Sequence, residues 1–250
     1  MKIITWNCAG ALRKKAKELD VLNADILVIQ ECENPSESTI EYQKWAGDFL
    51  WIGKNKNKGL GIFPKKENKI KQLDWHGEFE INGLKTKSSS THWTTEELEL
   101  FLPFSINSTY TALGVWTKGS DDQAFSYIGQ FWKYLQIHAR DLSYPNTIII
   151  GDFNSNTIWD KKDRWWSHSD IMQELREIKI ESAYHYQTNE SQGRETTPTF
   201  FHRKNLNKAY HIDYALLSSN ILPQSKVIIG KADDWLKISD HVPLSVEIRS

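Results

Sequence analysis

Short apolar runs that meet acidic or amide side chains are the feature that most restricts how this sequence can fold. Four such runs lie far apart along the chain. Three of them end at polar residues, and the fourth follows a pair of them: Asn7, Glu31, Asp152 with Asn154, and Asp240 with His241. Buried strands whose ends carry carboxylates place hard oxygen ligands on one rim of a sheet, where a divalent ion and a phosphate can meet. The pattern therefore predicts a metal-phosphate site at a sheet edge.

Strand-like and helix-like segments alternate along the chain, which is typical of an α/β fold. Several segments have the length and composition of strands: residues 3–7, 26–29, 58–63, 147–150, 211–217, 227–229 and 242–248. Residues 98–106 have a period of two and lead, through a turn at Asn107 and Ser108, into 110–117, as in an antiparallel hairpin. Mixed pairing of these strands predicts two sheets packed face to face.

Apolar residues at helical spacing predict the helices between these strands. They recur over residues 12–22, 36–45, 125–142 and 171–178. Asp121 or Asp122 is expected to cap the third helix, and Ser169 the fourth. We find no internal repeat, low-complexity tract or linker in the sequence. We therefore expect a single domain over residues 1–250, with the helices outside the two sheets.

The charge of the chain limits how it could hold a polyanion. Its formal net charge is -1 and its pI is near 6.7, which argues against holding nucleic acid by net charge alone. A local excess of positive charge exists between Lys54 and Lys87, a stretch that contains nine lysines and four acidic residues. This stretch is either a substrate-facing patch or an ordinary solvated lysine-rich face.

The two cysteines, Cys8 and Cys32, each follow a candidate site residue by one position. Two cysteines make neither a disulfide framework nor a zinc site, so packed thiols are the favoured interpretation over a redox or nucleophilic role. The sequence starts on a strand-like segment without an apolar signal, and it contains no apolar run long enough to cross a bilayer. A cytoplasmic enzyme without membrane contact is expected.

Four polar motifs carry the expected chemistry. In GDFN, Asp152 and Asn154 lie on the same side of an extended chain, so one can polarise a water while the other holds it or a phosphate oxygen. In QE, Glu31 lies at a strand end that suits Mg²⁺. In HIDY and SDH, Asp213 can orient His241 for contact with a phosphate oxygen. Each motif alone also fits an ordinary turn or a structural hydrogen bond, but their joint order favours catalysis.

With TWN at residues 5–7, these motifs make the sequence resemble the endonuclease/exonuclease/phosphatase superfamily, with the exonuclease III and apurinic endonuclease branch most similar. The resemblance implies a four-layer α/β sandwich and Mg²⁺- or Mn²⁺-dependent hydrolysis of a phosphate ester. By position, it implies that Glu31 is the principal metal ligand, with Asn7 and Asp240 nearby. Asp152 then aligns or deprotonates the attacking water, Asn154 assists it, and His241, braced by Asp213, contacts the phosphate.

One position departs from the family pattern. Members usually carry a His or Tyr that points at the phosphate from a middle strand, and the counterpart here is Trp116. An indole N–H can donate a hydrogen bond but cannot exchange a proton, so a general-acid role is doubtful at this position.

Two segments and one loop indicate where the substrate would bind. TPTFFH at residues 197–202 matches an aromatic loop of the exonuclease III branch that meets the nucleotide beside the cleaved bond, and KGLGIF at 58–63 matches its Lys-Gly strand. The loop after GDFN holds Trp159, Trp165 and Trp166, which are hard to assign to a core. The expected substrate contacts are Lys58, Trp116, Arg164, Phe200 and Phe201.

The favoured function is a metal-dependent phosphodiesterase that hydrolyses DNA by in-line attack of a metal-positioned water. DNA is preferred over RNA as the partner. A phosphatase for a small phosphorylated metabolite or inositol phosphate is the enzymatic alternative, and an inactive binding module of the same fold is the other. Endo or exo cleavage and the oligomeric state stay open.

Overall fold

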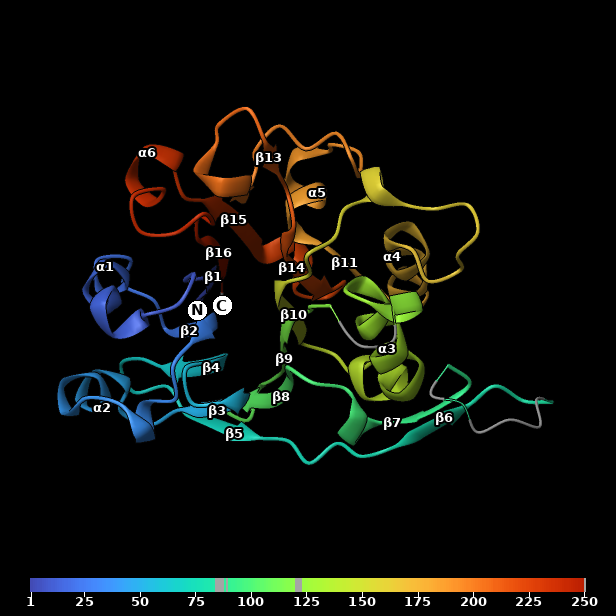
Figure 1. The fold of residues 1–250 in the computed structure, drawn as a ribbon, viewed down its shortest axis with the longest axis horizontal. Helices are drawn as coiled ribbons and strands as arrows, with labels where there is room; N and C mark the ends of the chain where they lie inside the picture. Colours follow the sequence, from blue (N-terminus) through green and yellow to red (C-terminus); the bar gives the residue numbers. More distant parts are fainter. Residues whose placement is uncertain (84–87, 89, 120–122, 250) are drawn as a thin grey trace.

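In the computed structural model, two mixed six-stranded sheets face each other with helices around them (Figure 1). The structure describes residues 1–83, 88, 90–119 and 123–249. The first sheet has the order β15 (Ser225–Ile229), β16 (Leu244–Ile248), β1 (Lys2–Asn7), β2 (Ile26–Cys32), β4 (Lys58–Pro64) and β3 (Leu50–Asn55). The second sheet has the order β11 (Ile180–Ser182), β14 (Asp213–Ser218), β10 (Thr147–Asp152), β9 (Tyr110–Trp116), β8 (Phe101–Ile106) and β5 (Ile70–Gln72). The predicted architecture of two packed mixed sheets is confirmed.

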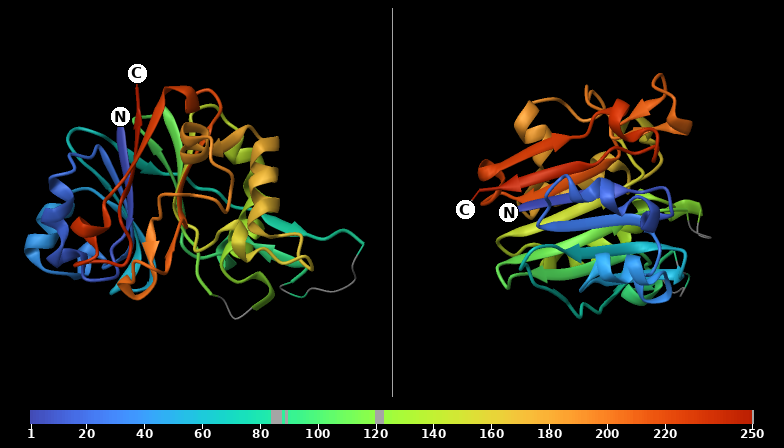
Figure 2. Two further views of the ribbon diagram at one scale, coloured as in Figure 1. Left: turned by 90° about the horizontal axis from the view of Figure 1, so that it is seen from above. Right: turned by 90° about the vertical axis from the view of Figure 1, so that its left-hand side faces the viewer.

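Helices cover the outer face of each sheet, as the view from above shows (Figure 2). The helices α1 (Ala16–Asp20) and α2 (Ile40–Ala46) pack on the first sheet, where Trp235 joins the same core. Two others pack on the second, α3 (Ile128–Leu142) and α4 (His168–Glu177). Two short helices, α5 (Ala183–Thr188) and α6 (Ala232–Trp235), complete the set among the described residues, with two small hairpins, β6 (Glu78–Glu80) with β7 (His92–Thr94) and β12 (Phe200–Phe201) with β13 (Ala209–Tyr210).

The continuous apolar runs of the sequence are explained by burial on both faces of each sheet. Successive side chains of a strand point to opposite faces. Ile3 accordingly packs between the sheets, whereas Ile4 packs under the helices of the first sheet. In the second sheet, Ile148 and Ile150 face the first sheet, and Ile149 faces the outer helices.

The strand register brings the polar strand ends to one edge. β1 and β2 are parallel, with Asn7 opposite Gln30, and β9 and β10 are parallel, with Trp116 opposite Asp152. β14 runs antiparallel to β10, so that its first residue, Asp213, is opposite Asp152. Gly151 allows β10 to pair this closely with β9, because a Cβ at Gly151 would lie 1.9 Å from the carbonyl oxygen of Val115.

Several predicted element boundaries differ from the structure. The helix expected over residues 12–22 is a 3₁₀ turn at Leu12–Lys14 followed by the short α1. α3 begins only at Ile128, and Phe125 belongs to a separate 3₁₀ turn. The expected caps Asp121 and Asp122 lie outside the described residues. The alternating segment 98–106 forms a strand only from Phe101, because Leu100 has a positive φ of 63°.

The cap of α4 was assigned two residues too late. Ser167, not Ser169, is the N-cap, and its hydroxyl accepts a hydrogen bond from the backbone N–H of Asp170. The Asp170 carboxylate in turn accepts one from the Ser167 N–H at 2.8 Å. This reciprocal pair satisfies two N–H groups that the helix leaves open, which fixes the start of the helix at this serine.

None of the helices in the described part of the chain is both long enough and apolar enough to span a membrane.

Candidate active site

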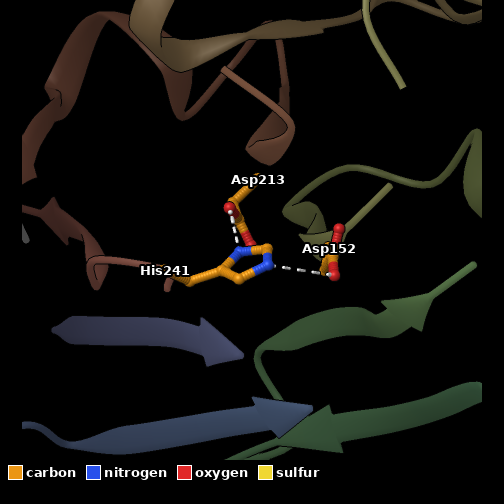
Figure 3. Close-up of side chains that lie close together, drawn as sticks. All are labelled: Asp152, Asp213 and His241. Carbon is orange, nitrogen blue, oxygen red and sulfur yellow. Dashed lines mark hydrogen bonds and ion pairs between the residues drawn. The ribbon is translucent and has the colours of Figure 1, made fainter. Parts of the chain in front are cut away.

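Predicted site residues from three segments of the chain meet at one edge of the paired sheets. Asp152 ends β10, Asp213 begins β14, and His241 lies just before β16. The three side chains point toward one another (Figure 3), and one ligand atom from each lies within 4.8 Å of the others. All three are buried. This juxtaposition of residues far apart in sequence makes the edge the candidate active site.

His241 is held between the two carboxylates. Its Nδ1 donates to Oδ2 of Asp213 at 2.9 Å, and its Nε2 lies 3.9 Å from Oδ2 of Asp152. Burial alone lowers the pKa of an imidazole, but the charges of Asp213 and Asp152 outweigh it and raise the pKa of His241 to about 9. The imidazole is therefore cationic at neutral pH, with Nε2 directed toward Asp152.

Asp152 is fixed by two asparagines, which donate three hydrogen bonds to its carboxylate. Asn7 Nδ2 donates to its Oδ2 at 2.9 Å, and the backbone N–H of Asn154 donates to its Oδ1 at 2.8 Å. The Asn154 side chain also donates to Oδ2 at 3.1 Å. Burial and the nearby Asp213 raise the pKa of Asp152 to about 7, against the lowering effect of His241 and Asn7. A carboxylate with this pKa can take up a proton near neutral pH.

Glu31 lies beside this group, at the end of β2. Its Oε1 accepts a long hydrogen bond of 3.4 Å from Asn7 Nδ2, and its Oε2 pairs with Nζ of Lys58 at 2.7 Å. Asn7 thus links the carboxylates of Glu31 and Asp152 through one amide nitrogen. Its Oδ1 accepts a hydrogen bond from the Ala9 N–H, so the present orientation suits a positioning role, and a metal-ligand role would require the amide to turn over.

The donors at this edge fit a hard divalent ion. Carboxylate oxygens are the ligands that Mg²⁺ prefers, and Glu31 already binds a cation, the ammonium group of Lys58. Within the described part of the chain, Asp213 Oδ1 is buried without a hydrogen-bond partner, so the site also holds an unused acceptor. Asp240 lies next to His241 in the chain, and its charge contributes to the raised pKa of that imidazole.

Two hydroxyl groups that sequence reasoning did not assign hold the site together. Thr199 Oγ1 accepts hydrogen bonds from the backbone N–H groups of Ile212 and Asp213, each at 3.0 Å. Ser239 Oγ donates to the carbonyl of Asn7 at 2.7 Å and accepts from the His241 N–H at 3.1 Å. The only sequence signal was their position inside TPTFFH and SDH, because a hydroxyl gives no hint of the backbone group that it will bind.

A groove of about 460 Å³ opens beside Asn154. Its lining includes Phe200, Trp159, Arg164 and Tyr127. Phe200 is half-buried, with its ring centre 4.6 Å from that of His241, and the Trp159 side chain is largely exposed and packs on Tyr210. The structure therefore brings two expected substrate contacts, Arg164 and Phe200, to one groove next to the buried dyad of Asp213 and His241.

Two other expected substrate contacts are buried. Phe201 is 5% exposed and packs in the core on the outer side of the first sheet, so its ring presents no open face for stacking in this structure. Trp116 is 6% exposed and packs between the sheets. The ammonium groups of Lys58 and Lys118 lie 5.9 and 5.8 Å from its ring centre. Trp116 therefore lies beneath the ammonium groups of two lysines, and its ring is not an open surface for a substrate.

Trp165 and Trp166 differ in their surroundings. Trp165 is exposed, whereas Trp166 is buried and donates from its indole N–H to the carbonyl of Ala124 at 2.8 Å. Trp166 therefore belongs to the core of the second sheet.

The lysine-rich stretch is not one patch. Lys58 begins β4 at the active edge, whereas Lys65 and Lys66 follow the other end of that strand. Lys66 pairs with Asp25, and the Lys65 ammonium donates to the carbonyl of Trp45. Lys85 and Lys87 lie outside the described residues. Among the described lysines of the stretch, those of the Lys54–Lys58 end are thus placed at the active edge.

The cysteines are packed thiols. Both are buried and free, and burial raises the pKa of Cys8 to about 12 and that of Cys32 well above its ordinary value. Neither group forms a thiolate at neutral pH, which removes the nucleophilic interpretation.

Two facing sheets with a buried histidine between two carboxylates at one edge are the arrangement that the sequence predicted for a phosphoester hydrolase. The family model described as "Endonuclease/Exonuclease/phosphatase family" matches residues 4–241, and the chain belongs to this family, whose enzymes are metal-dependent. A search of curated proteins gave no match.

Solved structures share the fold across the whole chain. The 3' phosphatase NExo from Neisseria, bound to a product DNA hairpin, is similar with a TM-score of 0.70 at 17% identity, covering 100% of both chains. The AP endonuclease LMAP from Leishmania major has a TM-score of 0.66 at 15% identity, covering 100% of this chain and 87% of that one. The endonuclease domain of TRAS1, a telomere-specific non-LTR retrotransposon, has a TM-score of 0.62 at 16% identity, covering 99% and 97%.

Proposed function

We propose that the protein is a Mg²⁺-dependent nuclease, with Mn²⁺ able to substitute, that hydrolyses phosphodiester bonds of DNA. The observation that carries the proposal is the groove beside Asn154. It is lined by Arg164, by accessible aromatic rings, and by Asn154 and Phe200, which contact Asp152 and His241 of the buried group. Base stacking on aromatic side chains and backbone contact by cations are the two contacts that bind single-stranded nucleic acid. Among the structural neighbours, the 3' phosphatase NExo is bound to a product DNA hairpin, and LMAP and TRAS1 are described as endonucleases, which supports a nucleic-acid substrate.

The residues of the site divide the chemistry between them. Asp152, with its raised pKa, would align the attacking water and take its proton, and Asn154 would keep Asp152 oriented. His241, cationic and braced by Asp213, would stabilise the negative charge that develops on the phosphate in the transition state. Burial of this group excludes bulk water, which strengthens each of these interactions.

We assign the metal ion to the Glu31 side of the site. Glu31 would be its principal ligand, with Asp240 and a turned Asn7 amide as further oxygen donors. When bound, Mg²⁺ supplies Lewis-acid stabilisation of the phosphate and leaving-group oxygens. The alternative location among Asp152, Asp213 and His241 is less suitable, because His241 Nδ1 and the facing Asp213 oxygen already satisfy each other.

A panel of substrates tests the proposal. Single-stranded, duplex, abasic and 3'-phosphorylated DNA oligonucleotides would be compared with matched RNA, inositol phosphates and a nucleotide monoester, each with Mg²⁺ or Mn²⁺. Efficient cleavage of DNA supports the nuclease. Hydrolysis confined to the small phosphates would establish the metabolite phosphatase instead, and binding of DNA without turnover of any substrate would establish a binding module. The cytoplasmic location stays a prediction.

A further inference from the structure

Lys58 and Glu31 are a cation and a carboxylate from neighbouring antiparallel strands. Lys58 is the first residue of β4, and the register of β4 with β2 shifts between Gln30 and Cys32, which places Glu31 in a bulge. Glu31 also has a positive φ of 62°, a conformation that a glutamate rarely adopts. Bulges of this kind redirect a side chain out of the regular ladder. The backbone of Glu31 is thus bent in a way that presents its carboxylate at the active edge.

The ion pair between Lys58 and Glu31 is exposed enough for Lys58 to exchange with another cation. The two charged groups are 2.7 Å apart, but the Lys58 side chain is 51% exposed and that of Glu31 20% exposed. An ion pair with this much solvent contact stabilises its geometry only weakly, so either group can exchange its partner. The Lys58 ammonium also lies 5.9 Å from the ring centre of Trp116, which gives it a second favourable surrounding away from Glu31.

We propose that Lys58 is an exchangeable counter-cation of Glu31, which competes with the divalent ion and turns to the substrate phosphate when the ion displaces it. The inference rests on the proposed function for the assignment of the metal ion to Glu31. It follows that metal binding and polyanion binding are coupled, because occupation of Glu31 by the ion leaves the charge of Lys58 without its carboxylate partner. An ammonium group without a carboxylate partner forms a strong charge-assisted hydrogen bond with a phosphate oxygen.

Lys118 provides a matched control. Its ammonium lies 5.8 Å from the same Trp116 ring, but it pairs with Glu99 at 3.7 Å and not with Glu31. Lys58→Met and Lys118→Met remove the same charge from the same side of the site. The difference between the two variants therefore isolates direct competition at Glu31 from the general electrostatic effect of losing a lysine.

The test measures Mn²⁺ affinity without substrate, by titration calorimetry or by the EPR signal of free Mn²⁺. Lys58→Met should bind Mn²⁺ about threefold to fivefold more tightly than the wild type, the range set by an exposed ion pair, and Lys118→Met should change affinity much less. Equal affinities in the two variants, or no gain in Lys58→Met, would overturn the inference. Lys58→Gln repeats the test with a polar side chain.

Glu31→Gln separates this inference from the proposed metal site. If Glu31→Gln weakens Mn²⁺ binding while Lys58→Met fails to strengthen it, the metal assignment stands and the exchange is wrong. If Glu31→Gln binds Mn²⁺ like the wild type, the metal assignment itself is wrong, and the exchange falls with it. A direct view of displacement comes from the ¹³C signal of reductively methylated Lys58, assigned by its loss in Lys58→Met, which should shift when Mg²⁺ is added to the wild type and stay in place in Glu31→Gln.

Discussion

Asp213 accepts a hydrogen bond of 2.9 Å from Nδ1 of His241, and both side chains are almost fully buried. Asp213 comes from the start of β14 and His241 from the segment before β16, so the pair connects the two sheets. The aspartate fixes the imidazole with its other nitrogen toward Asp152, as the orienting carboxylate of a catalytic histidine does. The two residues are therefore expected to function as one unit.

The first prediction tests this unit with a double-mutant cycle. His241→Ala should lower kcat by about 10²- to 10³-fold, the cost of removing a donor that acts mainly in the transition state, and Asp213→Asn should lower it somewhat less. The double variant should be little worse than His241→Ala, with KM nearly unchanged throughout. Additive losses in kcat would show that the residues act independently.

The second prediction concerns the charge of His241. In the metal-free protein, NMR should show its imidazole still protonated at pH 8 and titrating near the pKa of about 9 that the two aspartates impose. Because folding raises this pKa from about 6.5, the stabilisation is fully present below about pH 6.5 and is lost as the pH rises through about 9. Asp213→Asn should lower the pKa of His241. A wild-type titration at the ordinary histidine pKa would contradict the assignment of a cationic imidazole.

The third prediction is dependence on a divalent ion. EDTA should abolish hydrolysis and Mg²⁺ or Mn²⁺ should restore it, because the donors at the active edge are carboxylates suited to hard ions. Glu31→Gln should raise the metal concentration needed for half-maximal activity while leaving the melting temperature in metal-free buffer nearly unchanged, since the Glu31 side chain is at the rim of the fold. Full turnover in chelator would refute the metal mechanism, and a collapsed melting temperature would indicate a structural role for Glu31.

The fold was predictable from the sequence because its strands are buried on both faces, which makes each run apolar throughout. The dyad was predictable because Asp213 and His241 lie in short motifs whose order is specific. The exposure of the aromatic residues was not, since Phe200 and Phe201 are adjacent and identical, and only the strand pairing of β12 decides which ring enters the core. The pairing of Lys58 with Glu31 was equally hidden, because it depends on a bulge between two strands.

The fourth prediction uses this pair of phenylalanines. Phe200→Ala should weaken oligonucleotide binding by about 1–3 kcal/mol, the value of one stacked base, with little change in the free energy of unfolding. Phe201→Ala should instead destabilise the fold by about 3–5 kcal/mol, as expected for a large aromatic side chain removed from a core. Binding assays and thermal melts on both variants check this, and the reverse pattern would mean that the accessible ring has been misidentified.

The last prediction separates a nuclease from a metabolite phosphatase by salt dependence. A chain that contacts several phosphates releases several counterions, so its affinity for an oligonucleotide should fall steeply as the salt concentration rises. Lys56 lies in the turn before β4 at the active edge, and Arg164 lines the groove. Charge reversal at both, Lys56→Glu with Arg164→Glu, should weaken oligonucleotide binding and flatten its salt dependence. Lys58 is left intact here because changing it would also alter Glu31. The matched control reverses Lys69 and Lys71, which are exposed and belong to the far end of the second sheet, at or next to β5. Since that pair is remote from the groove, its reversal should leave the slope of log K against log salt nearly unchanged.

Equal flattening by both pairs would mean that the overall charge, and not the groove, controls binding. If oligonucleotides do not bind at any salt concentration while a nucleotide monoester or an inositol phosphate is hydrolysed efficiently, the site serves one small phosphate, and the nuclease proposal is wrong.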